Sequence, residues 1–197
     1  MMAAKTKIIL DRRKVMARIL GDRGDALLVT GLGAPTWDAA AVGDHANNFY
    51  LWGGMGGAVM TGLGLALAQP GRRVLVITGD GEMLMGLGGL ATVAVQKPAN
   101  LGICIIDNQR YGETGMQDTH TEFGVDLPAM ARGAGIAETA MVYTSKELDG
   151  AIAQLYDARG PVFVNVKVVP KEQPMILPLR DGPSIKHRFR DAVLGES

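Results

Sequence analysis

The chain has little of what ties a protein to a membrane, to nucleic acid or to an oxidising compartment. It has one cysteine, 5% aromatic residues, and 20 acidic against 20 basic side chains, so its formal net charge is zero. Without net positive charge there is no general field that attracts nucleic acid or anionic lipid. Charged side chains interrupt residues 1–20, which match neither a signal peptide nor a membrane span. We expect a cytoplasmic protein with no nucleic-acid and no membrane partner.

The single cysteine, Cys104, lies inside an apolar run. It has no partner for an internal disulfide, and a thiol in such a strand is more often a small core side chain than a nucleophile. The 197 residues, 47% of them hydrophobic, suffice for one substantial core. We predict a single domain over residues 1–197.

Short apolar runs separated by glycine-rich stretches indicate an α/β fold. Residues 73–78 and 101–106 are rich in β-branched side chains, as in buried parallel strands, and residues 82–96 contain no proline and suit a crossover helix between them. The expected architecture is a three-layer domain with a mainly parallel sheet flanked by helices. Other strands are predicted at residues 26–30 and 161–168, and other helices at residues 7–20, near Trp37, at 56–68 and at 144–157.

Two oxygen-bearing side chains follow neighbouring strands at the points where those strands end. Asp80 lies in the sequence Gly79-Asp80-Gly81, and Asn108 follows 28 positions later. Because ligands gather at the carboxyl ends of parallel strands, we expect both side chains at one edge of the sheet. Carboxylate and amide oxygens suit Mg²⁺, and a glycine-flanked turn that opens a helix suits a diphosphate. The tripeptide alone would favour an ordinary turn with Asp80 as a helix cap; Asn108 favours the metal site.

This pair resembles the diphosphate-and-metal motif of thiamine-diphosphate enzymes, which implies the thiamine-diphosphate-binding fold. The sequence Asn48-Phe-Tyr-Leu-Trp-Gly-Gly-Met-Gly56 and the sequence Asp107-Asn-Gln-Arg-Tyr-Gly-Glu-Thr-Gly-Met-Gln117 resemble the small or C-terminal part of sulfopyruvate and phosphonopyruvate decarboxylases. The similarity runs from about residue 27 to about residue 189. It implies thiamine diphosphate and Mg²⁺ as cofactors and a small 2-oxo acid as substrate.

The resemblance also implies roles for individual residues. Asp80 and Asn108 would bind the metal through their side chains, and Arg110 through its main-chain carbonyl. Met55 would wedge between the two cofactor rings and bend the cofactor, so that its amine reaches the thiazolium carbon. Met55 as a flexible gap-filler at a helix start is the alternative. The cofactor-binding set implied in this way is Gly53, Gly54, Met55, Gly79, Asp80, Gly81, Glu82, Asn108, Arg110, Tyr111 and Gly112.

Residues 109–123 are polar and contain glycine. A stretch of this length is typical of a functional loop, which would here cover the cofactor. His120 in this loop has a side chain suited to proton transfer near neutral pH and is the candidate catalytic residue; a solvated loop histidine is the alternative. Glu113, Thr114 and Gln117 are candidates for contact with the substrate. Glu82 would complement the dipole of the helix that it opens, with its carboxylate directed away from the phosphates.

The chain lacks a second α/β unit that would carry the glutamate needed on the cofactor's pyrimidine ring. The resemblance therefore implies a partner subunit with a pyrimidine-binding domain, and the chain would be half of an active site. Three alternatives stay open: the thiamine-binding beta subunit of a 2-oxoacid:ferredoxin oxidoreductase, a carboligase similar to acetolactate synthase, and a binding subunit without turnover. A cluster needs about four thiolates, which one cysteine does not supply.

Overall fold

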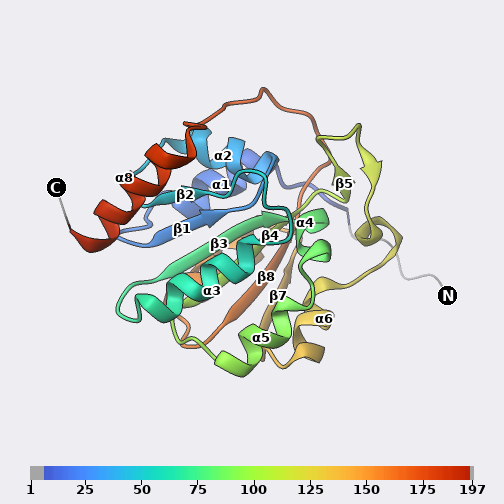
Figure 1. The fold of residues 1–197 in the computed structure, drawn as a ribbon. Coiled ribbons are helices and arrows are strands. Elements are labelled where there is room, and N and C mark those ends of the chain that lie inside the picture. The colour runs from blue at the N-terminus through green and yellow to red at the C-terminus, as the bar shows by residue number, and fades with distance from the viewer. Residues whose placement is uncertain (1–6, 196–197) are drawn as a thin grey trace.

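The computed structural model describes residues 7–195, which form a parallel six-stranded sheet with helices on both faces (Figure 1). The strands lie in the order β2-β1-β3-β4-β8-β7, and every pair of neighbours is parallel. Their bounds are Leu27–Thr30 (β1), Asn48–Tyr50 (β2), Val74–Gly79 (β3), Leu101–Asp107 (β4), Glu138–Val142 (β7) and Val162–Lys167 (β8). The predicted α/β fold with a mainly parallel sheet is confirmed.

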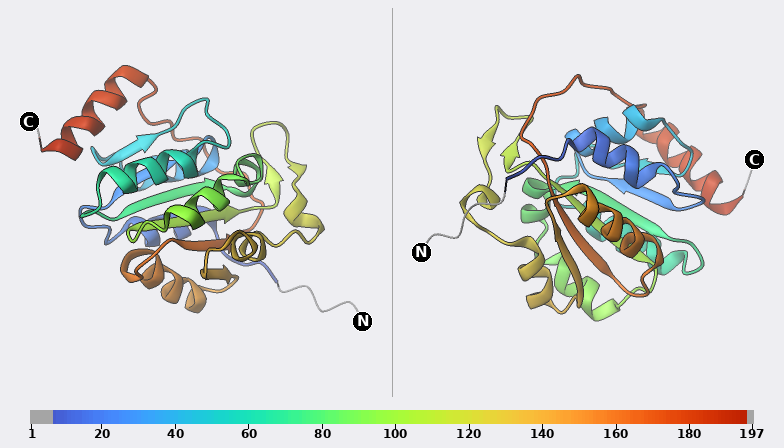
Figure 2. Two further views of the ribbon diagram at one scale, coloured as in Figure 1. Left: turned by 60° about the horizontal axis from the view of Figure 1, so that its bottom comes forward. Right: turned by 180° about the vertical axis from the view of Figure 1, so that it is seen from behind.

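Helices cover both faces of this sheet, as the views in Figures 1 and 2 show. On one face lie α3 (Ala58–Ala68), α5 (Gly89–Gln96) and α6 (Leu127–Ala134); on the other lie α1 (Arg12–Leu20), α2 (Ala34–Val42) and α7 (Ser145–Asp157). The pleat divides each strand between two cores, because successive side chains point to opposite faces. In β3, Val74 and Val76 join the α3 and α5 side, whereas Leu75 and Ile77 join the α1 and α7 side.

The chain reverses its direction of travel across the sheet between β1 and β3. From β1 it crosses to β2 on one side, and from β3 it crosses to β4 on the other. The loops after β1 and β3 therefore diverge at the carboxyl ends of the strands, which opens a crevice there. The short hairpin of β5 (Arg110–Tyr111) and β6 (Gln117–Asp118) follows β4 at the same edge.

The crossover between β3 and β4 is two helices, so the expectation of one helix over residues 82–96 is wrong. Helix α4 covers Asp80–Met85, and α5 begins at Gly89. The break lies at Gly86, whose added Cβ would meet the carbonyl oxygen of Gly56 at 2.2 Å. Close backbone approach and three glycines within four residues favour the interruption over a continuous helix.

The first helix begins later than residue 7, which corrects a second expectation. Leu10 pairs with Val168 in an isolated bridge, and Asp11 caps α1 by accepting hydrogen bonds from the N–H groups of Arg13 and Lys14. Extended pairing before a capping aspartate excludes helix from the preceding residues. By contrast α7 has the predicted capping box between Thr144 and Glu147.

Residues 109–123 are more ordered than the predicted loop, since they form the β5–β6 hairpin and the 3₁₀ helix η1 (His120–Phe123). The sequence did not predict β2, β7 or α6. After β8 the chain runs without regular structure to α8 (Gly182–Leu194), which packs beside β2. There Phe189 and Phe49 place their ring centroids 5.4 Å apart.

Cys104 is buried in β4, as predicted. Burial raises the pKa of its thiol to about 12, so at neutral pH the group is a protonated core side chain. Within residues 7–195 no helix is both long and apolar enough to cross a bilayer.

Candidate cofactor and metal site

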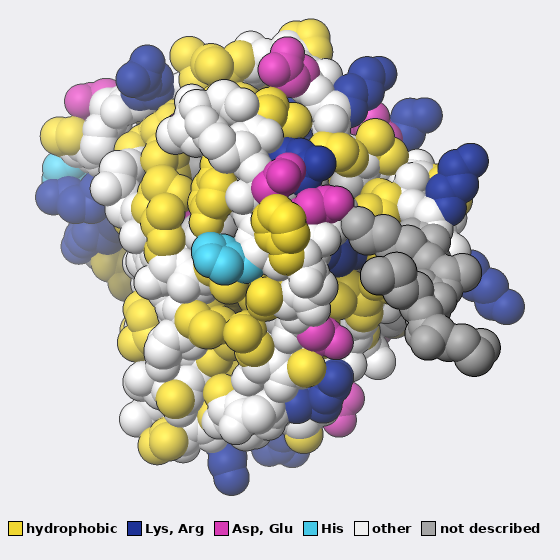
Figure 3. All heavy atoms as spheres, turned by 90° about the vertical axis from the view of Figure 1, so that its right-hand side faces the viewer, with side chains coloured by type: hydrophobic (Ala, Val, Ile, Leu, Met, Phe, Trp, Pro, Cys, Tyr) yellow, Lys and Arg dark blue, Asp and Glu magenta, His cyan; other side chains and the backbone are white. Residues whose placement is uncertain are grey.

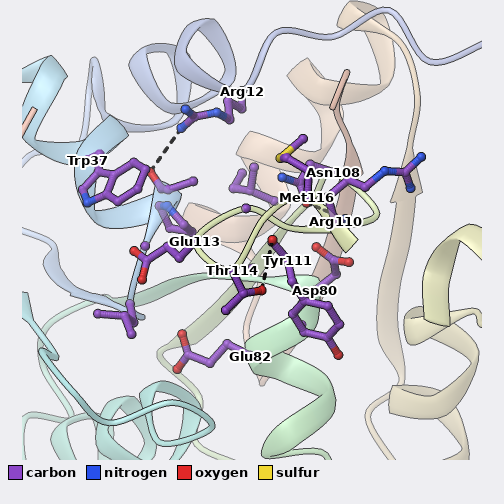
Figure 4. Close-up of a pocket in the computed structure, with 18 of the residues that line it drawn as sticks. Arg12, Trp37, Asp80, Glu82, Asn108, Arg110, Tyr111, Glu113, Thr114 and Met116 are labelled. Carbon is purple, nitrogen blue, oxygen red and sulfur yellow. Dashed lines mark hydrogen bonds between the residues drawn. The ribbon is translucent and has the colours of Figure 1, made fainter. Parts of the chain in front are cut away.

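A cavity of about 290 Å³ lies at the carboxyl ends of β1, β3 and β4 (Figure 4). Its walls are the turn after β1, the first turn of α4, the β5–β6 hairpin and the segment at residues 171–175. This volume is at the lower end of the range for small-molecule sites. Of the residues predicted to bind the cofactor, those that line the cavity are Met55, Gly79, Asp80, Gly81, Glu82, Asn108, Arg110, Tyr111 and Gly112.

Three predicted residues do not line this cavity. Gly53 and Gly54 lie in the segment between β2 and α3, next to Met55. His120 begins η1 and is exposed, outside the lining residues. Of the candidate substrate contacts, Glu113 and Thr114 line the cavity. Nothing in this arrangement brings His120 to a reacting atom, so its catalytic role stays a prediction.

Asp80 is 1% exposed and is held by two threonines from the segment after the hairpin. The hydroxyl groups of Thr119 and Thr121 donate to its Oδ2, the second at 3.2 Å. The same Thr121 hydroxyl lies 2.8 Å from Oδ1 of Asp107 at the end of β4. These threonines were missed by sequence reasoning, because nothing in the local pattern distinguishes them from ordinary loop residues.

Asp107 is fully buried and forms an ion pair with a lysine side chain. Lys167 at the end of β8 places Nζ 2.6 Å from Oδ2 of Asp107, and Asn165 donates to the same oxygen at 2.9 Å. Lys167 neutralises Asp107, whereas among residues 7–195 no Lys or Arg forms an ion pair with Asp80. A signal for this network existed: Asn165 and Lys167 are polar residues two apart in an otherwise apolar strand, so they share a face.

The backbone between Asn108 and Arg110 bends at Gln109, which has a left-handed conformation. Gln109 has φ 63°, which is uncommon for a residue with a side chain and is typical of functional sites. Its N–H donates to Asp107 at 3.1 Å and its side-chain amide donates to the carbonyl of Thr121 at 3.0 Å, which stabilise the bend. The bend places Asn108 and Arg110 at the cavity.

Arg110 offers its backbone, because its side chain is engaged elsewhere. The guanidinium pairs with Asp118 at 2.8 Å and with Glu122 at 3.4 Å, and it extends away from Asp80 (Figure 4). Its N–H donates to Oδ1 of Asn108 at 2.9 Å. This arrangement agrees with the predicted role of the main-chain carbonyl and does not test it.

The close approach of the hairpin to the Asp80 turn requires glycine. A Cβ on Gly81 would meet the ring of Tyr111 at 2.4 Å, so the ring packs directly against the backbone of the turn. The turn after β1 lies on the other side of the cavity, where Gly33 has φ 86° and Glu113 of the hairpin lies beside it. The hairpin thus covers the cavity between these two turns.

A buried arginine side chain lies beside the turn after β1, and the sequence did not predict it. Arg12 of α1 is 4% exposed, lines the cavity, and places Nη1 2.5 Å from Oδ2 of Asp38 and 3.4 Å from the carbonyl of Ala34 (Figure 4). The Thr36 hydroxyl of the same turn is buried and bonds to the Gly31 carbonyl and to Thr30. It is therefore engaged within the turn.

Glu82 is buried at 4% exposure, although it lies in the first turn of α4. Burial raises the pKa of its carboxyl, against hydrogen bonds that lower it. Thr78 donates to Oε2 at 2.5 Å, and the N–H of Ala58 donates to Oε1 at 3.3 Å. Glu82 lies in the first turn of α4, as its predicted role in complementing the helix dipole requires, but that role does not describe these contacts.

The donors at this site suit a hard cation that binds together with an anion. No three His, Cys, Asp or Glu side chains converge as a metal site within the described residues. Asp80, the Asn108 amide and the Arg110 carbonyl are all oxygen donors, which favour Mg²⁺, Ca²⁺ or Mn²⁺ over softer metals. One charged carboxylate is too few for a dedicated ion cage, so the set fits a metal that takes further oxygens from a diphosphate and water.

The pKa of Asp80 is raised to about 6, first by burial and second by the Asp107 carboxylate, while the threonine hydrogen bonds lower it. Because the unfolded value is about 3.9, the proton is held more tightly in the folded chain. The resulting stabilisation is complete below about pH 4 and is lost as the pH rises through about 6.

Asp80→Asn should therefore become more stable than the wild type as the pH rises from about 4 to 6, in the absence of metal. We expect a gain of roughly 3 kcal/mol in the free energy of unfolding near pH 7, because the buried charge is removed. Urea unfolding across this pH range measures the gain, and Asp22→Asn at an exposed position is the control. Parallel pH profiles for Asp80→Asn and the wild type would contradict the assignment.

Comparison with known proteins places the chain in a family. Residues 32–166 match the family model described as thiamine pyrophosphate enzyme, C-terminal TPP binding domain. The chain belongs to the thiamine pyrophosphate enzyme family. The matched residues include every wall of the cavity except α1 and the segment at 171–175, and thiamine diphosphate is the cofactor of this domain.

This thiamine pyrophosphate enzyme domain is 38% identical to "Sulfopyruvate decarboxylase subunit beta" of Methanothermobacter thermautotrophicus, over 95% of this chain and 98% of that one. It is 37% identical to "Phosphonopyruvate decarboxylase" of Streptomyces viridochromogenes, over 74% of this chain and 36% of that one. The solved thiamine diphosphate-dependent 4-hydroxybenzoylformate decarboxylase of Rhodococcus jostii matches with a TM-score of 0.71 at 21% identity, over 88% of this chain and 35% of that one.

The structural match shows the fold alone, and the domain spans about a third of the length of the last two proteins. Together with the sulfopyruvate decarboxylase subunits these relatives confirm the predicted family and the predicted enzyme class, a thiamine-diphosphate-dependent carboxy-lyase. The roles of single residues are not tested by these matches.

Proposed function

We propose that the chain is the diphosphate-binding subunit of a 2-oxo-acid decarboxylase that uses thiamine diphosphate and Mg²⁺ and resembles sulfopyruvate and phosphonopyruvate decarboxylases. The observation that carries the proposal is the placement of Asp80 and Asn108 at the carboxyl ends of adjacent strands on one cavity. A relative named as a decarboxylase subunit, matched over nearly its whole length, supports it. The substrate would be a small 2-oxo acid.

Each wall of the cavity would have a separate task. Asp80, Asn108 and the Arg110 carbonyl would hold Mg²⁺, and the backbone of Gly79 and Gly81 would lie against the diphosphate. Tyr111 and the hairpin would exclude water, and Met55 would support the bent cofactor. When bound, the cofactor accepts the electron pair that CO₂ leaves behind on the substrate.

The carboxylates that line the cavity do not supply an acid for the pyrimidine ring. Apart from Asp80 they are Glu82, Glu113 and Glu172. Glu82 is occupied by Thr78 and backbone N–H groups, and Glu113 lies beside Gly33 at the opposite turn. Glu172 lies in the segment after β8. A pyrimidine-domain partner subunit would therefore provide the glutamate.

An uncharged surface next to Met55 supports such a partner. Residues 46–71 and 83–96 contain no Asp, Glu, Lys or Arg. They nevertheless expose large apolar side chains on α3, α4, α5 and the segment before α3: Met55, Met60, Leu67, Met85 and Val95. In Figure 3 hydrophobic side chains run down one side and the centre of the molecule, and most Lys and Arg lie near its edge. Exposed apolar patches of this kind mark interaction sites.

The products distinguish the decarboxylase from its two enzyme alternatives. With its partner, the chain should release aldehyde and CO₂ from a 2-oxo acid without coenzyme A, ferredoxin or iron–sulfur absorbance, because its one cysteine is buried and no electron path exists in it. Anaerobic product analysis measures this. Acyl thioester formed only with coenzyme A and an electron acceptor would indicate the ferredoxin oxidoreductase, and a 2-hydroxy ketone formed with added aldehyde would indicate a carboligase.

A further inference from the structure

Glu82 is a buried carboxylate for which the described residues provide no cation. Its hydrogen-bond donors are the Thr78 hydroxyl at 2.5 Å and the N–H of Ala58 at 3.3 Å, and the backbones of Leu32 and Gly56 lie close enough to lower its pKa. Burying an unpaired charge is costly unless hydrogen bonds replace the lost water. These groups offset part of that cost, which indicates that the carboxylate has a specific task.

These groups come from three segments that are far apart in the sequence and converge on Glu82. Leu32 belongs to the turn after β1, Thr78 to β3, and Gly56 and Ala58 to the segment that leads into α3. The carboxylate packs directly against the turn after β1, where a Cβ on Gly31 would lie 1.5 Å from Oε2 of Glu82. The carboxylate thus connects the two turns that flank the cavity to the segment that contains Met55.

Apart from the close backbone contact between Gly56 and Gly86, the Met55 segment has few other anchors. Gly53 and Gly56 have φ of 74° and 82°, Met55 is 46% exposed, and the internal bond of the segment runs from the N–H of Gly57 to the carbonyl of Gly54. Met55 lies three positions before Ala58, whose N–H donates to Glu82, and directly before Gly56, whose backbone lies close to the same carboxylate. Fixing that N–H fixes the backbone from which the Met55 side chain extends.

We infer that Glu82 is a positioning residue that holds Met55 in place by binding the backbone N–H of Ala58 and lying against the backbone of Gly56, and so couples the diphosphate turn to the part of the site that bends the cofactor. The inference rests on the proposed function, because Met55 has this task only if thiamine diphosphate binds here. A carboxylate suits the position, because both of its oxygens accept hydrogen bonds and neither donates one. The NH₂ group of an amide would face a hydrogen-bond donor instead.

Amide hydrogen exchange of the full chain without cofactor tests the first step. In Glu82→Gln we expect the amides of residues 56–58 to exchange roughly tenfold faster, while those of residues 101–107 in β4 stay unchanged. Glu138→Gln, at an exposed carboxylate, is the matched control and should change neither. Gly31→Ala, which displaces the carboxylate from another segment, should reproduce the local effect. Unchanged exchange at residues 56–58 in both variants would overturn the inference.

Calorimetric titration of thiamine diphosphate in Mg²⁺ tests the second step. Glu82→Gln should lower the affinity roughly tenfold in the wild-type background and less than about twofold in Met55→Ala, because the two residues act together. In the complex with the partner subunit, kcat should fall while the KM of the 2-oxo acid stays constant. Additive losses, as from direct contact of Glu82 with the cofactor, would overturn this inference alone. A wild-type chain that binds no thiamine diphosphate would overturn the proposed function as well.

Discussion

Asp80→Ala is expected to abolish the binding of thiamine diphosphate in the presence of Mg²⁺. The substitution removes the one charged metal donor at the cavity, where Lys167 already neutralises Asp107. Without Asp80, no negatively charged side chain of the predicted metal-binding set would remain to hold a cation against the phosphates. We expect an affinity loss of more than roughly a hundredfold, because loss of groups that merely support a ligand already costs tenfold to a hundredfold.

Isothermal calorimetry with and without EDTA measures this effect. EDTA should abolish binding by the wild-type chain to the same extent as the substitution does, and Mg²⁺ should restore binding only to the wild type. Asp157→Ala, at an exposed position near the end of α7, is the control and should bind as the wild type does. Unchanged affinity in Asp80→Ala would refute the metal assignment.

The purified chain alone should show no detectable decarboxylation at saturating thiamine diphosphate and Mg²⁺. The cavity has the donors for the metal and diphosphate, but its carboxylates are engaged or lie at the opposite turn, so the pyrimidine ring would lack its acid. Addition of a pyrimidine-domain subunit should raise turnover to the ordinary enzymatic range of about 1–1,000 s⁻¹. Steady-state release of CO₂ from a 2-oxo acid, with each subunit alone and with both, measures the difference.

Full turnover by the lone chain would show that an acid of this chain activates the cofactor. Glu113→Gln would then be the first variant to examine, because Glu113 lines the cavity and lies in the loop between β5 and β6. Loss of activity in that variant would indicate that Glu113, and not a glutamate of the partner subunit, activates the cofactor. The matched variant Glu138→Gln changes an exposed carboxylate far from the cavity and should retain activity in either case.

Local patterns predicted the strands that carry the site to within one or two residues. The strands β3, β4 and β8 are mostly apolar runs, as is typical of strands buried on both faces. Asp80 and Asn108 follow two of them directly, so their placement at one edge of the sheet follows from strand direction alone. The capping box of α7 is likewise readable, since it depends on residues three positions apart.

Errors arose where long-range contacts override local preference. The stretch at residues 82–96 has a helical composition, yet Gly86 packs against Gly56 thirty positions earlier and the helix breaks there. Strands β2 and β7 are short and lie at the two edges of the sheet, where the alternation of apolar residues is weakest. Neither feature is encoded within a window of a few residues.

The sequence by itself determined the α/β class, the family and the edge of the sheet at which Asp80 and Asn108 lie, because these depend on short patterns and strand direction. Only the tertiary structure decided which side chains support that site. Thr121 between Asp80 and Asp107, Lys167 on Asp107, and Glu82 beneath the Met55 segment are contacts between residues 14 to 60 positions apart or on different elements. Their meeting depends on side-chain direction and packing, which no local pattern specifies.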